Sequence, residues 1–227
     1  MSSTPFTPLI RRTYATFVLD SSISMSGIRD ATIAHFNEQL NGIKEDCGKI
    51  EVLTSLFSFS NKVNPVFKFQ QIGGIPSITE DDYQPNGGTA LFDGIGEAVT
   101  HLKTRSDWDA DSVSHLFLIL TDGEENSSRK FTGDQVSEMI EDLQENHGWT
   151  FTWLCANQSV EDILQTNVSI GNVNAFCANT SGVVDASVKT RGGIRHYFSS
   201  MSSMSCSSLG GFNKKAKFVK SFYSPTI

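Results

Sequence analysis

An apolar run that stops at an acidic, hydroxyl-rich turn is the feature that most constrains how this chain can fold. It spans residues 14–27 and reads Y-A-T-F-V-L-D-S-S-I-S-M-S-G. The apolar part predicts a buried strand, and the turn predicts the point where the chain leaves a sheet. Asp20, Ser22 and Ser24 lie at alternate positions, so a loop curling around one point would aim one carboxylate and two hydroxyls inward. Oxygen ligands of this kind suit a small hard cation.

Two later segments offer the additional oxygen ligands that such a cation needs, because Mg²⁺ prefers six-fold coordination. Thr89 follows a Gly-Gly pair at the start of a helical pattern, and Asp122 follows the strongest apolar run, residues 115–121. Thr89 also suits a helix N-cap, a role that is compatible with metal binding. We therefore expect Mg²⁺, with Mn²⁺ or Ca²⁺ as alternatives, at a site made of Asp20, Ser22, Ser24, Thr89 and Asp122.

Several other polar residues near these motifs are weaker candidates. Asp93 either complements the dipole of the helix after Thr89 or holds the hydroxyls of the site from behind. His35 has no His, Cys or carboxylate four residues later and is expected to be structural or solvated. The remaining carboxylates of these loops are expected to be solvated: Asp81, Asp82, Glu124 and Glu125. Glu124 and Glu125 are also expected to make the rim of the site acidic.

The three segments together resemble the von Willebrand factor A-type domain family. They read D-x-S-x-S at 20–24, G-G-T-A-L-F-D at 87–93 and L-I-L-T-D-G-E-E-N at 118–126. The metal-ion-dependent adhesion site (MIDAS) of that family uses matching residues. The resemblance covers roughly residues 13–200. It looks closest to small stand-alone bacterial and phage members, with which the chain shares short sequence motifs such as T-D-G-E-E-N and A-N-Q.

The pattern of strands and helices predicts an α/β fold of the doubly wound, Rossmann-like kind that the resemblance implies. This fold has a mostly parallel central sheet, one antiparallel edge strand and helices on both faces. Further strands are expected at 50–59, 66–72, 115–120, 149–156 and 173–177, with a hairpin turn at 60–65. Helices are expected at 27–47, from 89, from a capping box at Thr132 and Gln135, at 159–165 and at 181–198, the last interrupted at Gly192-Gly193.

Four segments are expected along the chain: an N-terminal arm (1–12), the von Willebrand factor A-type domain (13–198), a Ser/Gly-rich linker (199–211) and a basic-aromatic tail (212–227). The linker lacks apolar periodicity, so removing residues 200–227 is expected to leave the domain folded. The tail is either solvated or a strand that docks on the sheet of a second protein.

Charge and cysteine content narrow the functional classes. Residues 1–162 carry 11 Lys and Arg against 24 Asp and Glu, whereas residues 163–227 carry 7 against 1. The acidic part argues against nucleic-acid binding. The first residues predict neither a signal peptide nor a membrane helix, which favours a cytoplasmic or virion-associated protein with no membrane partner. The four cysteines lack metal-binding spacing, so reduced thiols are expected.

A protein-binding module is the favoured function, with the carboxylate of a partner completing the metal coordination, as is common in the family. The alternative is a structural component of a phage virion or a large bacterial assembly that uses the fold as a scaffold. A metal-dependent hydrolase is disfavoured because the site motifs contain no His or Lys base. The sequence also lacks a G-x-S-x-G elbow, a P-loop and a G-x-G-x-x-G motif, so no enzymatic activity is expected.

Overall fold

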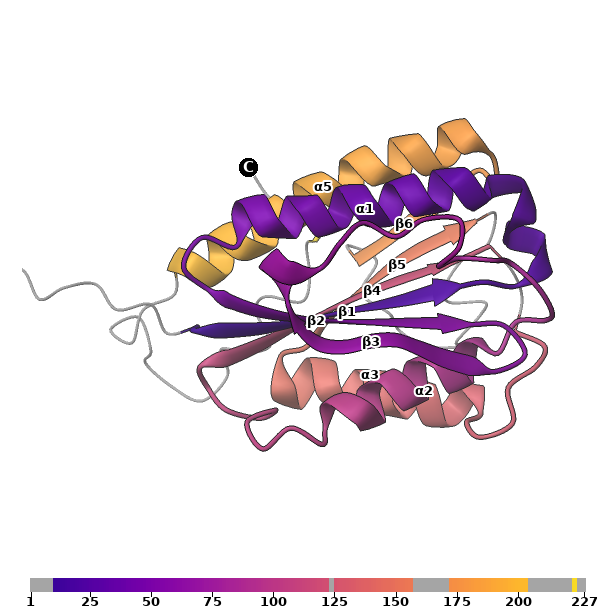
Figure 1. The fold of residues 1–227 in the computed structure, drawn as a ribbon. Helices are drawn as coiled ribbons and strands as arrows, with labels where there is room; N and C mark the ends of the chain where they lie inside the picture. The colour runs from indigo at the N-terminus through magenta and orange to yellow at the C-terminus, as the bar shows by residue number, and fades with distance from the viewer. Residues whose placement is uncertain (1–9, 123–124, 157–171, 204–221, 224–227) are drawn as a thin grey trace, which may run out of the picture.

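A six-stranded sheet forms the centre of the protein in a computed structural model that describes residues 10–122, 125–156, 172–203 and 222–223. The strands lie in the order β3-β2-β1-β4-β5-β6 (Figure 1). They are β1 Arg12–Asp20, β2 Glu51–Phe59, β3 Val63–Gln71, β4 Val113–Thr121, β5 Thr150–Ala156 and β6 Val173–Phe176. All neighbouring pairs are parallel except β2 and β3. The expected mostly parallel sheet with one antiparallel edge strand, β3, is therefore confirmed.

Helices cover both faces of the sheet: α1 and α5 lie on one face and α2 and α3 on the other (Figure 1). Their bounds are Arg29–Asp46 for α1, Leu91–Leu102 for α2, Gly133–His147 for α3 and Thr180–Ser203 for α5, with short 3₁₀ helices η1 at Ile23–Ile28 and η2 at Ile72–Gly74. The helix expected at 159–165 lies outside the described residues. Within the described ranges, no helix combines the length and hydropathy that crossing a membrane requires.

The burial of both faces explains why β1 is apolar without alternation. Phe17 and Leu19 belong to the core beneath α1 and α5, whereas Val18 belongs to the core beneath α2 and α3. Successive strand side chains point to opposite faces, so a central strand covered on both sides carries apolar residues on both faces, with few polar residues between them. This arrangement leaves β1 in the middle of the sheet, with β2 and β4 on either side.

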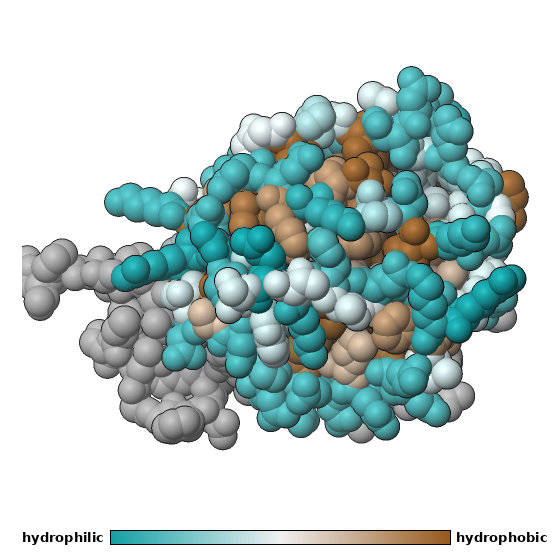
Figure 2. Space-filling model, turned by 60° about the horizontal axis from the view of Figure 1, so that its bottom comes forward, coloured by the Kyte–Doolittle hydropathy of each residue, from teal (hydrophilic) through white to brown (hydrophobic). Residues whose placement is uncertain are grey.

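The outer surface is mostly polar. Figure 2 shows hydrophilic side chains over most of one face, with smaller apolar areas between them. Among the described residues, only three large apolar side chains are mainly exposed: Ile23, Val184 and Val188. Ile23 is notable among them because it lies on η1, directly after β1.

Two predicted helix starts have different outcomes. The capping box of α3 is confirmed: the Thr132 side chain accepts a hydrogen bond from the Gln135 amide, and the Gln135 side chain accepts one from the Thr132 amide. The N-cap role of Thr89 is wrong, because α2 begins at Leu91 with Ala90 at its N-cap. Thr89 is therefore available for another role.

The ends of the expected domain differ from the structure. Arg12 already belongs to β1 and Ile10 is buried, so the N-terminal arm is shorter than expected. At the other end, α5 continues through Gly192-Gly193 without interruption and reaches Ser203. The first residues of the expected linker are thus helical, and Met201 is buried in the core.

Position 193 in α5 has room only for glycine, because another side chain occupies the space where a Cβ atom would lie. A Cβ atom on Gly193 would lie 2.3 Å from the ring of Phe222, which is only 3% exposed. The Phe222 amide donates a hydrogen bond of 3.0 Å to Oδ1 of the buried Asn172. The ring of Tyr223 packs edge-on against Phe222 at 4.9 Å. These two tail residues therefore pack on their own domain, contrary to the expected solvated tail or strand on a second protein.

We predict opposite effects for alanine at the two adjacent glycines of α5. Gly192→Ala meets no atom within 4 Å, so the higher helix propensity should raise the free energy of unfolding by about 0.5–1 kcal/mol. Gly193→Ala should lower it by about 1–3 kcal/mol, because the methyl group overlaps the Phe222 ring. Urea unfolding measures both.

A chain truncated after Ser203 is the control for this prediction, because without Phe222 both substitutions should stabilise the domain. Equal stabilisation by both alanines in the full-length chain would show that Phe222 does not occupy this position.

Candidate metal centre

The five predicted metal ligands come from three segments that meet at one edge of the sheet: the end of β1 with the turn after it, the link before α2, and the first position after β4. Asp20 is the last residue of β1, and Ser22 and Ser24 follow it; Asp122 directly follows β4, and Thr89 precedes α2. Strands β1 and β4 pair in parallel with Leu19 opposite Leu120, so their ends meet at one edge of the sheet. Ligands in open α/β sheets bind at this edge.

A chain of hydrogen bonds joins four of the five side chains. The Ser22 amide donates to Oδ1 of Asp20 at 2.7 Å, and the Oγ atoms of Ser22 and Ser24 are 3.0 Å apart. The Ser24 hydroxyl donates to Oδ1 of Asp122 at 2.8 Å. The structure therefore brings these residues together as the sequence predicts.

The electrostatics of the cluster favour a cation. Asp20 is fully buried, and burial, together with the nearby charge of Asp122, raises its pKa to about 6. Burial also raises the pKa of Asp122. Within the described part of the chain, no Lys, Arg or His pairs with either carboxylate. A divalent cation among these oxygens would relieve the unfavourable burial of the two negative charges.

The ligand chemistry of the cluster also fits a hard cation. Its groups are carboxylate and hydroxyl oxygens, which Mg²⁺ and Ca²⁺ prefer. The described residues contain no group of three or more His, Cys, Asp or Glu that could hold a metal ion. Serine and threonine hydroxyls would therefore have to complete any metal site here.

Thr89, the fifth predicted ligand, is held at the site by its backbone. Its buried side chain forms no hydrogen bond with the described residues. Its backbone is clamped by Asn126: the Thr89 amide donates to Oδ1 of Asn126 at 2.9 Å, and the Asn126 amide donates to the Thr89 carbonyl at 3.0 Å. Asn61, in the turn before β3, accepts a bond of 2.8 Å from the Gly88 amide. This clamp leaves the Thr89 hydroxyl available to a ligand.

The clamp also explains the glycine before Thr89. A Cβ atom on Gly88 would lie 2.2 Å from Oγ of Ser127 and 2.7 Å from Oδ1 of Asn126. Asn61 and Asn126 were not predicted as functional residues. Asn126 lies within the motif T-D-G-E-E-N, so the motif contained a signal for it, whereas nothing in the sequence around Asn61 indicates this role.

Two further residues missed in the sequence hold Asp20 in place. The Thr121 hydroxyl donates to Oδ2 of Asp20 at 2.7 Å. The Tyr83 hydroxyl donates to the main-chain carbonyl of Asp20, and burial raises the pKa of Tyr83, so it stays a neutral donor. With the Ser22 amide on Oδ1, both oxygens of the Asp20 carboxylate are therefore oriented before any ligand arrives.

Asp93 lies in the first turn of α2, where one of its two expected roles places it, whereas Glu125 differs from the expected solvated carboxylate. The Asp93 carboxylate accepts hydrogen bonds from the amides of residues 129–131. The Glu125 carboxylate accepts from Ser127, Ser128 and the Phe92 amide in the first turn of α2. Both therefore tie the loop after β4 to α2, and neither contacts the hydroxyls of the site. Glu124 lies outside the described residues.

The remaining weaker candidates stay away from the cluster. His35 is buried in α1, and burial lowers its pKa to about 4, which agrees with a structural histidine. Asp81 and Asp82 are exposed as expected, although Asp82 also accepts hydrogen bonds from Thr79. Among the described residues, no disulfide joins Cys47, Cys155 or Cys177.

The raised pKa of Asp20 predicts a pH-dependent stability of the metal-free domain. The ordinary pKa of this carboxyl group is 3.8 and its pKa in the folded domain is about 6. The stabilisation from protonated Asp20 is therefore complete below pH 3.8 and is lost as the pH rises through 6. The expected loss of unfolding free energy in EDTA is about 3 kcal/mol.

Asp20→Asn should remove this loss, because the amide stays neutral while its oxygen still accepts a hydrogen bond. Urea unfolding at several pH values in EDTA measures the effect, with Asp81→Asn as the control for removal of a surface carboxylate. An unchanged pH dependence in Asp20→Asn would contradict the assignment.

We also predict that Asn126 positions Thr89 for metal binding. Asn126→Ala removes the acceptor for the Thr89 amide and should weaken Mn²⁺ binding about tenfold, as is typical when a residue that orients a ligand is lost. Asn126→Asp keeps an acceptor oxygen and should restore much of the affinity. Electron paramagnetic resonance of free Mn²⁺ measures the binding, with Asn146→Ala on α3 as the control. Equal affinities in wild type and Asn126→Ala would rule out the positioning role.

We compared the chain with models of protein families, with curated protein sequences and with solved structures. The family model described as the von Willebrand factor type A domain matches residues 16–187. No curated protein sequence matches the chain.

Three solved structures share the fold at low sequence identity. Proximal thread matrix protein 1 from the mussel byssus, solved with a zinc-occupied MIDAS motif, is 15% identical with a TM-score of 0.56; the match covers 81% of this chain and 46% of that one. The pilus adhesin SpaC from Lactobacillus rhamnosus GG is 14% identical with a TM-score of 0.62, over 83% of this chain and 30% of that one. The manganese-loaded TRAP protein of Plasmodium vivax is 14% identical with a TM-score of 0.52, over 81% and 76%.

This chain spans about half of the length of the byssus protein, and identities this low show the fold alone. The family model, in contrast, covers well over half of the chain and includes the three loops that form the cluster. The chain therefore belongs to the von Willebrand factor type A domain family.

Proposed function

We propose that this domain is a divalent-metal-dependent module that binds a protein partner. The proposed ligands of the metal, direct or through water, are Asp20, Ser22, Ser24, Thr89 and Asp122. The observation that carries the proposal is the hydrogen-bonded series from the buried Asp20 to the exposed Ser24 and on to Asp122. It connects a buried carboxylate to the surface, where a partner can reach the site.

The charge of the ligand set supports binding of an acidic partner group. Only Asp20 and Asp122 are anionic, whereas the serine and threonine ligands are neutral hydroxyls. A bound dication would supply a positive charge that two carboxylates do not exceed, so it would still attract a carboxylate from a partner. Thr121 and Tyr83 hold Asp20 in one orientation, which preserves the arrangement of the oxygens while the partner binds.

We propose Mg²⁺ as the ion, with Mn²⁺ or Ca²⁺ as alternatives, because all the ligands are oxygens. The zinc-occupied MIDAS motif of the byssus protein and the manganese-loaded TRAP protein support the choice of a divalent ion in this fold. We further propose that the domain is not an enzyme. In the described part of the chain, no His or Lys hydrogen-bonds to the cluster, so its candidate bases are the two carboxylates that would bind the metal.

A peptide selection tests the proposed function and does not require the partner itself. Immobilised domain is exposed in MgCl₂ to two libraries of random peptides, one with a fixed central Asp and a matched one with a fixed central Asn. The Asp library should be retained and then released by EDTA, whereas the Asn library should pass through. The variants Asp20→Asn and Thr89→Ala should retain about tenfold less of the Asp library.

Retention that persists in EDTA, or that is equal for both libraries, would contradict this function. Such a result would favour the alternative of a structural component of a virion or a bacterial assembly, in which the fold serves as a scaffold and the metal is not needed for contact.

A further inference from the structure

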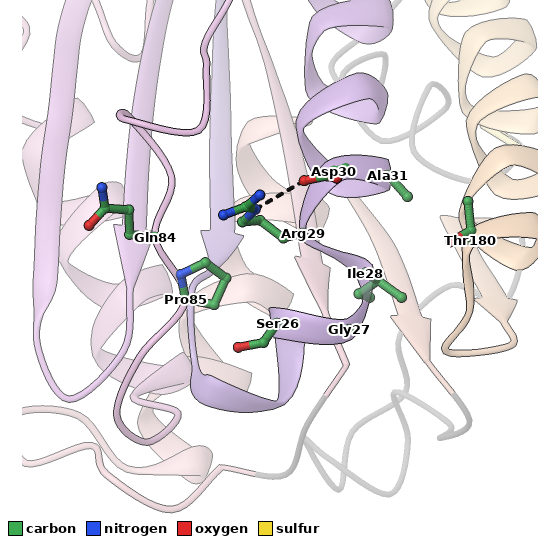
Figure 3. Close-up of a pocket in the computed structure, with 9 residues that line it drawn as sticks. All are labelled: Ser26, Gly27, Ile28, Arg29, Asp30, Ala31, Gln84, Pro85 and Thr180. Carbon is green, nitrogen blue, oxygen red and sulfur yellow. Dashed lines mark hydrogen bonds and ion pairs between the residues drawn. The ribbon is translucent and has the colours of Figure 1, made fainter.

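A cleft of about 570 Å³ opens beside the metal centre, on the side of α1. Its walls come from η1 and the first turn of α1, from Gln84 and Pro85 in the link before Thr89, and from Thr180 at the start of α5 (Figure 3). This volume is within the range that binds ligands or large side chains. The cleft thus lies at the same edge of the sheet as the proposed ligands.

The same short helix carries the proposed metal ligand Ser24 and the first cleft residue, Ser26. A 3₁₀ helix rises about 2.0 Å per residue, so the cleft begins about 4 Å along η1 from Ser24. An extended chain advances about 3.3 Å per residue. A partner segment with its acidic residue at the metal can therefore place a residue two or three positions away in the cleft. Ile23, which begins the same short helix and is 63% exposed, offers this segment an apolar contact.

The charges at the cleft are unequal. Arg29 projects into it and pairs with Asp30, another lining residue, at 3.0 Å (Figure 3). Arg29 also pairs at 2.9 Å with Glu80, which lies outside the lining. The side chains of Asp30 and Glu80 remain 78% and 66% exposed, whereas that of Arg29 is 35% exposed. One guanidinium against two more exposed carboxylates leaves a net negative charge that faces solvent.

The walls suit the aliphatic part of a long side chain. Ile28 and Ala31 are buried beneath the floor and Pro85 is half-buried at the side, so apolar atoms line the way to the carboxylates. Lys and Arg place their methylene stems along such surfaces while the charged end reaches a polar group. A shorter side chain would not reach the carboxylates, and an acidic one would be repelled by them.

We infer that the cleft selects partners in which a Lys or Arg lies two or three residues from the metal-binding carboxylate. This inference rests on the proposed function and identifies the kind of partner segment that it would bind. The metal would supply the contact that every such partner shares, and the cleft would supply the discrimination among acidic segments.

The Asp-fixed peptide library in MgCl₂ tests the inference through the residues enriched around the fixed Asp. Lys and Arg should be enriched two or three positions away on one side. A synthetic peptide with Lys there should bind about threefold tighter than one with norleucine, which keeps the stem and lacks the charge, as expected of an exposed ion pair. Fluorescence anisotropy of labelled peptides measures the ratio.

A double variant, Asp30→Asn with Glu80→Gln, leaves Arg29 alone in the cleft and should abolish or reverse the preference for Lys. It should leave Mn²⁺ affinity unchanged, because neither side chain belongs to the cluster. Glu141→Gln with Glu145→Gln, two exposed positions on α3 across the sheet, makes the same charge change and should keep the preference.

The outcomes separate this inference from the function on which it rests. Mg²⁺-dependent binding with no basic preference, or with a preference that the cleft variant retains, overturns the role of the cleft and leaves the binding function standing. Binding that does not depend on Mg²⁺ overturns the proposed function, and with it the inference about partners.

Discussion

Asp20 carries a fully buried carboxylate at the end of the central strand, and the described residues around it include no basic side chain as a partner. Its position follows from β1 lying between β2 and β4, because both neighbours continue to the same edge and surround the last residue. Hydroxyls and a backbone amide satisfy its hydrogen bonds but leave its charge uncompensated, which raises its pKa. A cation bound at this edge would remove that electrostatic cost, so the fold favours metal binding.

Hydrogen bonds between the loops, and not only those within the cluster, hold the segments around this carboxylate in place. Asn126 and Asn61 clamp the segment before α2 from two different loops, and Gly88 allows both to approach. Asp93 and Glu125 direct their negative charge at backbone amides of the loop after β4 and the start of α2. Much of the acidity of this region therefore stabilises loops, whereas Asp30 and Glu80 at the adjacent cleft remain mainly exposed to solvent.

In the proposed function, different residues set the affinity for the metal and the selectivity among partners. Buried, pre-oriented oxygens such as those of Asp20 are suited to bind a metal strongly, since little ordering is needed when it arrives. The exposed pairs of Arg29 are weak individually, and weak exposed pairs are suited to tuning which partner binds. At the far end of the chain, Phe222 fills the space beside Gly193 and attaches part of the tail to α5, which extends the folded domain beyond its last helix.

Local sequence determined the strands, most helices and the membership of the candidate metal cluster. The apolar runs of β1 and β4 specify buried parallel strands, and parallel strands bring the residues after them to one edge, so Asp20 and Asp122 were predictable as neighbours. The capping box at Thr132 was predictable for a related reason, because it is a contact between residues three positions apart.

Only the tertiary structure decided the contacts between residues far apart in the chain. Asn61 reaches Gly88 across 27 residues, Tyr83 reaches Asp20 across 63, and Phe222 reaches Asn172 across 50, and no local pattern encodes such distances. The Gly-Gly pair in α5 suggested a break because propensity considers only the helix itself, whereas the packed ring of Phe222 makes glycine necessary at position 193. The sequence thus determined which groups are candidates to bind a metal, and packing decided which groups hold them in place.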